Sequence, residues 1–204
     1  MKKNGFTRTN FVKQNLRGFT LVEILVVIGI TAIVGTILVV IFTNTLRGSN
    51  KAQILAVIKQ NGQSVLENMD KTIRNAYNVV CPASGSGNTL VVEKNGEYTR
   101  YRIALSANSY IPLSCYTNGC IVWEKSTTLP SCDPADPMFS ANILTDTNAQ
   151  TGVKINSGSF YVNRPAGFKA AVTINFILSP GVNASSIITS QIDPVVFQTT
   201  IGLR

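Results

Sequence analysis

The chain has 204 residues and a formal net charge of +8, with 18 Lys and Arg against 10 Asp and Glu, and it contains no His. Without His the most common general base and metal ligand is missing, and the sequence has no catalytic Ser motif, phosphate-binding loop or paired-carboxylate motif. The composition therefore predicts neither an enzyme nor a cofactor.

Residues 1–18 carry much of the basic surplus. The five basic residues of this stretch are accompanied by no acid, and the rest of the chain has 13 basic and 10 acidic residues, or +3. Because Lys and Arg beside a membrane span stay cytoplasmic, the surplus predicts a cytoplasmic leader and a translocated C-terminal part. The basic residues of the leader are Lys2, Lys3, Arg8, Lys13 and Arg17.

The basic residues of the C-terminal part are scattered along the chain. They predict a solvated surface rather than a nucleic-acid patch, although a role in DNA uptake stays open. They are Lys94, Arg100, Arg102, Lys125, Arg164 and Lys169.

Residues 19–42 form a long apolar run. From Phe19 to Phe42 every residue is apolar, Gly or Thr except Glu23. At ~1.5 Å per residue a helix of this length exceeds the ~30 Å of a bilayer's hydrocarbon core. The run therefore predicts a membrane-spanning helix.

Glu23 is the one charge in this run. A carboxylate inside a membrane span is costly and indicates a partner or a function, but the residues that follow offer no cation. Cleavage after Gly18 would create a new α-amino group on Phe19, one helical turn from Glu23. The amino group of one copy and the carboxylate of a neighbour would neutralise each other, which predicts a polymer.

The sequence Gly18-Phe19-Thr20-Leu21-Val22-Glu23, between a basic leader and an apolar run, resembles the class III signal of type IV prepilins and of type II secretion pseudopilins. The resemblance implies that a membrane-embedded aspartyl prepilin peptidase cuts after Gly18 and N-methylates Phe19. It also implies that Glu23 sets the register between subunits in a filament.

Two other interpretations of the opening compete with this one. A secretory signal is cut beyond its apolar region at small residues, whereas this run is too long, contains Glu23 and has no such site after it. A plain single-pass anchor explains the length and the basic flank, but neither Glu23 nor the Gly18-Phe19 junction.

The helix is predicted to continue past the apolar run to about Tyr77, because no Pro interrupts residues 19–81. Its second half has an apolar stripe that we expect to pack against the C-terminal domain. The stripe consists of Ile54, Ile58, Val65, Met69, Ile73 and Ala76 or Tyr77.

After Asn78 the composition changes to that of a β-rich head. Residues 89–94 and 97–105, joined by Asn95-Gly96, predict a β-hairpin. Residues 85–87 resemble a flexible turn, and residues 127–150 are predicted to be loop. Further strands are predicted at residues 121–125, 159–163, 168–178 and 195–203.

The expected fold class is α+β: a pilin-like long N-terminal helix, first transmembrane and then amphipathic, packed on a C-terminal antiparallel sheet. The final strand is similar to that of PilW-like minor pilins and J-type minor pseudopilins. The expected segments are a cleaved leader at 1–18, a transmembrane or filament-core half at 19–43, an amphipathic half at 44–78 and a globular head at 79–204.

Four cysteines lie in the part predicted to be extracytoplasmic, where disulfides persist. The sequence leaves three pairings open. The turn-like residues 116–119 favour Cys115 with Cys120, which leaves Cys81 with Cys132. Zinc is disfavoured because His and paired C-x2-C spacings are absent.

Calcium is the other metal that the sequence could hold, at Asp133 and Asp136 near Asp146, because hard cations favour clustered oxygens. Turn-forming Asp residues beside Pro explain the same pattern better, so no metal is predicted.

The first functional hypothesis is a structural subunit, a minor pilin, of a type IV pilus-type filament for adhesion, motility or DNA uptake. A minor pseudopilin of a type II secretion system is the alternative, and a membrane-tethered extracytoplasmic binding module is a second one. The expected partners are prepilin peptidase, other pilin or pseudopilin subunits, the inner membrane and the filament assembly machinery. The subunit is expected in the inner membrane as a single-pass protein and then in a filament in the periplasm or at the cell surface.

Overall fold

A computed structural model describes residues 18–105, 112–133, 135–138, 141–185 and 189–204. The chain divides into two compact units, one ending at Thr45 and the other running from Leu46 to Arg204, and each is described by itself. The predicted leader, apart from Gly18, lies outside the described residues, as does Pro134 of the predicted loop.

Helix α1 (Leu21–Arg74) is the long helix that the sequence predicts. Lys71 and Arg74 lie in its last turn, where cations interact favourably with the helix dipole. Arg74 Nη2 lies 2.8 Å from Asp70 Oδ1. The hydrogen bond from Arg74 lowers the pKa of the Asp70 carboxyl. In the second unit α1 buries one stripe, formed by Ile58, Gly62, Val65, Met69 and Ile73.

The first sheet has the strand order β1-β3-β4-β5-β6, and its neighbouring strands are antiparallel. The predicted hairpin is confirmed: β3 and β4 pair from Thr89–Arg102 to Lys94–Glu97. Asn95 and Gly96 have φ angles of 54° and 79°, as a type I′ turn requires. The strands are β1 (Asn78–Cys81), β3 (Thr89–Lys94), β4 (Glu97–Ala104), β5 (Cys120–Ser126) and β6 (Asn142–Ile143).

The second sheet has the order β2-β7-β8-β9, also antiparallel. The prediction of a flexible turn at residues 85–87 was wrong, because these residues pair with Phe160–Val162 as an edge strand. The strands are β2 (Gly85–Gly87), β7 (Val153–Asn163), β8 (Ala171–Pro180) and β9 (Val195–Gly202).

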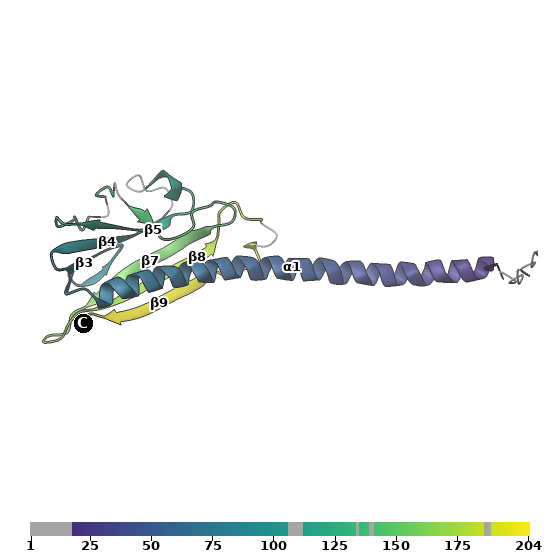
Figure 1. Ribbon diagram of the computed structural model, residues 1–204, viewed down its shortest axis with the longest axis horizontal. Helices are drawn as coiled ribbons and strands as arrows, with labels where there is room; N and C mark the ends of the chain where they lie inside the picture. Colours follow the sequence, from purple (N-terminus) through teal and green to yellow (C-terminus); the bar gives the residue numbers. More distant parts are fainter. Residues whose placement is uncertain (1–17, 106–111, 134, 139–140, 186–188) are drawn as a thin grey trace, which may run out of the picture. The chain divides into compact units, whose positions relative to one another are not determined.

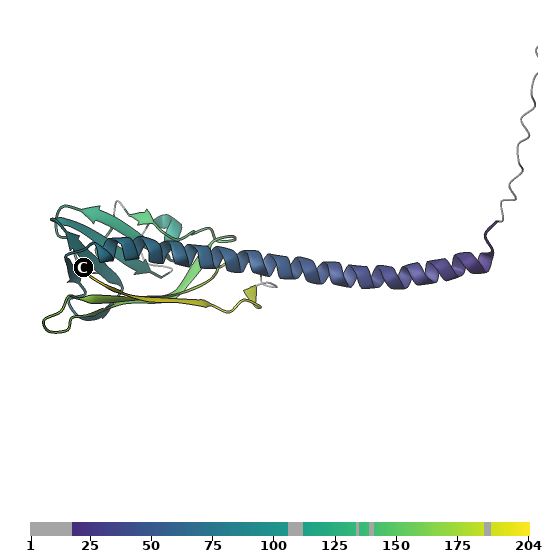
Figure 2. The same ribbon diagram turned by 60° about the horizontal axis from the view of Figure 1, so that its bottom comes forward.

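The head therefore contains two antiparallel sheets where the sequence predicted one. Both sheets lie along the C-terminal half of α1, one on each side in Figure 2, and Figure 1 shows β9 beside the helix. One core joins all three layers, with Met69 from α1, Tyr101 from the first sheet and Phe176 from the second. Periodicity predicts strands, but long-range packing decides which strands share a sheet.

A smaller core lies on the other face of the first sheet. It contains Ala104, Cys115, Cys120, Val122 and Met138, and the short 3-10 helix η1 (Leu113–Cys115) contributes to it. The expected loop at residues 127–150 includes the two-residue strand β6, which pairs with β5.

The prediction that the scattered basic residues lie on a solvated surface was wrong for two of them. Arg100 is 3% exposed and Arg102 is 1% exposed. Arg102 Nη2 donates to the backbone oxygen of Asp133 at 3.1 Å, and Arg100 Nη2 donates to that of Pro137 at 3.1 Å. The segment between Ser131 and Pro137 thus covers both guanidinium groups, a long-range contact that charge spacing does not reveal.

Candidate assembly site at the start of helix α1

The first turn of α1 forms a reciprocal pair of hydrogen bonds. The Glu23 backbone N–H donates to Thr20 Oγ1 at 3.2 Å, and the Thr20 backbone N–H donates to Glu23 Oε2 at 3.4 Å. This is a capping box, in which residues three apart satisfy N–H groups that the helix leaves unpaired. This role of Thr20 was not predicted from the sequence, although the Thr-x-x-Glu pattern before an apolar run is the ordinary signal of a capping box.

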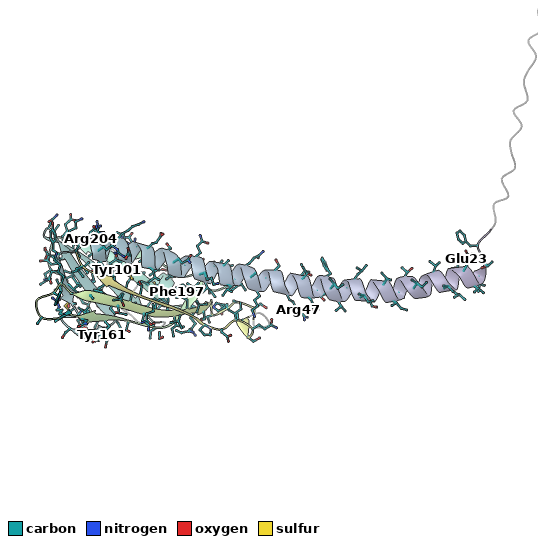
Figure 3. The ribbon with its side chains drawn as sticks, turned by 90° about the horizontal axis from the view of Figure 1, so that it is seen from below. Glu23, Arg47, Tyr101, Tyr161, Phe197 and Arg204 are labelled. Atoms are coloured by element: carbon teal, nitrogen blue, oxygen red, sulfur yellow. A yellow bond between two sulfur atoms is a disulfide. The ribbon has the colours of Figure 1, made fainter. Side chains whose placement is uncertain are left out.

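Besides capping the helix, Glu23 places a negative charge at the start of α1. Its side chain is exposed in the single chain, and residues 18–45 contain no Lys or Arg. Figure 3 labels Glu23 in the first turn of the helix. The carboxylate is therefore held in a fixed place by Thr20 while its charge has no counter-ion within residues 18–45.

The apolar run after Glu23 is suited to a lipid or protein environment. An 18-residue window of α1 reaches a mean hydropathy of 3.1 and none of it is buried inside the chain. By length and composition this is the one helix among the described residues that could cross a membrane. Thr31, Thr43 and Thr45 donate their hydroxyl groups to backbone oxygens four residues earlier. These threonine hydroxyl groups therefore have hydrogen-bond partners within the helix itself.

The sequence around the start of α1 matches a known family motif. Residues 13–39 match the prokaryotic N-terminal methylation motif. The chain carries the class III signal of type IV pilins and pseudopilins. No curated protein and no solved structure gives a significant match.

The methylation motif and the apolar helix together indicate a membrane-anchored single-pass protein with a pilin-like precursor sequence. Such a signal implies processing by prepilin peptidase and assembly with other pilin subunits. Proteins with this motif are structural rather than enzymatic.

Two disulfides hold the head. Cys115 is joined to Cys120 across a separation of 5 residues, and Cys81 is joined to Cys132 across 51 residues. The first closes the turn after η1, and the second ties β1 to the segment that covers Arg100. These are the two pairs that the turn-like residues 116–119 favour.

The carboxylates considered for calcium have protein partners. Asp136 Oδ2 accepts from Arg100 Nη1 at 3.0 Å, Asp133 Oδ1 from the Ala135 N–H at 2.8 Å and Asp146 Oδ1 from the Asn148 N–H at 3.0 Å. In the described part of the chain no three His, Cys, Asp or Glu residues are grouped so as to hold a metal.

Arg100 is instead the buried centre of an ion-pair network with Glu124 and Asp136. Its Nε donates to Glu124 Oε1 at 2.6 Å, and its Nη1 to the Ser131 backbone oxygen at 3.3 Å. Burial, reinforced by the charge of Arg100, lowers the pKa of the neighbouring Arg102 guanidinium. The network thus links Ser131, Asp136 and Pro137 to Arg100 of β4.

Proposed function

We propose that this chain is a pilin-like structural subunit that prepilin peptidase cleaves after Gly18 and methylates at Phe19, and that it then assembles into a type IV pilus-type filament. The observation that carries the proposal is the position of Glu23. Its charge sits in the first turn of an apolar helix within the methylation motif, one turn from the residue that cleavage would make the N-terminus.

The proposed mechanism has three steps. The apolar half of α1 stores the subunit in the inner membrane with the leader in the cytoplasm. The Phe19 amino group of one subunit and the Glu23 carboxylate of its neighbour pair as the span leaves lipid. In this pair the two opposite charges compensate each other inside an apolar bundle, where either charge alone is strongly penalised.

The finer proposal is a minor subunit of the PilW-like or J-type kind, with the β-rich head outside the cytoplasm. Two disulfides in the head support an oxidising compartment. Subunits of a surface pilus are recovered by shearing cells, whereas a pseudopilin stays cell-associated and its deletion blocks secretion. Shearing and secretion assays on one deletion strain therefore separate these two assignments.

The mature N-terminus provides the first test. Mass spectrometry of protein from cells with the peptidase is expected to find a chain that begins at methylated Phe19. An intact leader on the assembled or membrane-bound protein would contradict processing and favour a membrane-tethered binding module.

Three variants separate the charge of Glu23 from its capping role. Glu23→Gln keeps an acceptor that suits a capping box but removes the charge, so we expect normal membrane insertion and about tenfold or greater loss of filament incorporation. Glu23→Ala removes both properties and should lose as much. Thr20→Ala removes the hydroxyl acceptor of the capping box, a change of about 1 kcal/mol, and keeps the Glu23 charge, so it should retain more incorporation than Glu23→Gln. Normal incorporation of Glu23→Gln would overturn the pairing mechanism.

A further inference from the structure

A groove lies between α1 and β9 on the head. It has a volume of about 660 Å³ and is lined by Gln63, Leu66, Glu67, Asp70 and Lys71 of the helix and by Thr199 of β9. Leu66 is half-buried against the core and gives the groove an apolar floor. Nothing in the described part of the chain fills this groove.

Glu67 is the carboxylate of this groove that makes no ion pair within the described residues. Asp70 is engaged by Arg74 at 2.8 Å. Glu67 is exposed, and among the described residues no ion pair reaches it, not even from Lys71 one turn along the helix. The groove therefore presents an apolar floor with one unpaired carboxylate, Glu67, and one lysine, Lys71.

The helix face that lines the groove continues toward the N-terminus of α1, where it carries a lysine instead of an acid. Ala52, Ala56, Lys59, Gln63 and Leu66 are spaced three or four residues apart and so share one face of the helix. Ala52, Ala56 and Lys59 are all exposed. The two alanines would let another chain approach closely, and Lys59 places a cation on this face eight residues before Glu67.

We propose that the groove binds the Ala52–Lys59 stretch of α1 from a second copy of this chain, with Lys59 of that copy beside Glu67. The inference rests on the proposed function in its coarser form, a filament subunit that neighbours copies of itself, because helices anchored in one membrane are parallel and can face each other along this stripe. In register, two copies would oppose Lys59 to Lys59 and Glu67 to Glu67. A displacement of eight residues, about 12 Å along the helix, pairs opposite charges instead.

The proposed contact does not close within a pair of subunits. Each copy contributes its groove to one neighbour and its lysine face to the other, so the contact is heterologous and contains a translation. Contacts of this kind propagate into filaments instead of closing into dimers. The charge pattern along one helix face would thus set the axial step between these neighbours.

Charge exchange tests the contact in the full-length chain with its assembly machinery. Glu67→Lys and Lys59→Glu are each expected to lower the amount of processed protein in sheared filaments by about tenfold, since each places like charges together. The double variant restores opposite charges in exchanged positions and should recover to within about twofold of the unchanged chain. Lys51→Glu is the matched control, since Lys51 is an exposed lysine on α1 that lies about 160° around the helix from Glu67.

A double variant no better than the single ones, or equal loss in Lys51→Glu, would overturn the proposal. So would loss in Glu67→Lys alone with a normal Lys59→Glu, which would assign the groove to a different subunit. Failure of the proposed function looks different, because the unchanged chain would then keep its leader or be missing from filaments. Thermal unfolding of each variant should match the unchanged chain, since both side chains are exposed.

Discussion

Gly62 of α1 lies directly against the ring of Phe197 of β9. A Cβ atom on Gly62 would lie 2.6 Å from Phe197 Cδ1 and closer still to Cε1 and Cζ. The ring also stacks on Phe176 of β8, with ring centroids 5.2 Å apart and 16° between the planes. The missing side chain at Gly62 thus lets the last strand of the chain pack on the helix (Figure 3).

Gly62→Ala should destabilise the head by about 1–3 kcal/mol despite the better helix propensity of Ala, because the added methyl group overlaps the ring. Denaturation of the purified full-length chain, followed by fluorescence of its one tryptophan, Trp123, measures the change. Phe197→Leu in the same chain should relieve part of the loss.

Gly48→Ala is the matched control for that substitution. Nothing lies within 4 Å of a Cβ at Gly48, so the change should be neutral or stabilise α1 by up to about 1 kcal/mol. Equal destabilisation by the two substitutions would show that overlap with the Phe197 ring does not set the effect.

The burial of Tyr101 makes the folded chain less stable at alkaline pH. Its side chain is 0% exposed, and its hydroxyl lies 2.9 Å from Asn68 Oδ1 and 2.8 Å from Thr72 Oγ1 on α1. Burial raises the pKa of Tyr101 from 10.0 to about 12, partly offset by the Thr72 hydrogen bond. The folded state therefore holds the phenol proton more tightly than the unfolded state does.

The contribution of this proton is fully present below pH 10 and is lost as pH rises toward about 12. The free energy of unfolding should fall in this window by about 2–3 kcal/mol more in the unchanged chain than in Tyr101→Phe. Denaturation midpoints at several pH values between 9 and about 12 measure the difference. Parallel curves for the two chains would show that Tyr101 titrates normally.

The two disulfides should contribute unequally to stability. In the chain-entropy account, the link between Cys81 and Cys132 closes 51 residues and contributes about 4 kcal/mol, while that between Cys115 and Cys120 closes 5 and contributes about 2 kcal/mol. Paired Cys→Ser variants, made one disulfide at a time, should therefore rank in this order on denaturation. The opposite order would show that packing around Cys115 in the smaller core matters more than loop length.

Local patterns in the sequence were enough for several parts of the molecule. The apolar run around Glu23, the absence of Pro and the spacing of the stripe at Ile58 and Val65 fix one long helix. Asn95-Gly96 fixes the turn between β3 and β4, since both residues need positive φ. The motif from residue 13 to residue 39 is contiguous, and so it is legible without any structure.

Only the tertiary structure decided which strands share a sheet, why Gly62 lies in the buried stripe and where Arg100 and Arg102 lie. Each of these depends on residues far apart in the chain: Gly62 on Phe197, and Arg100 on Glu124 and Asp136. A helix or a hairpin turn is set by hydrogen bonds and side-chain periods within a few neighbouring residues, which one segment records. Burial of a charge, or close approach of a ring to a backbone, depends on the segment that covers it, and the local sequence does not record that segment.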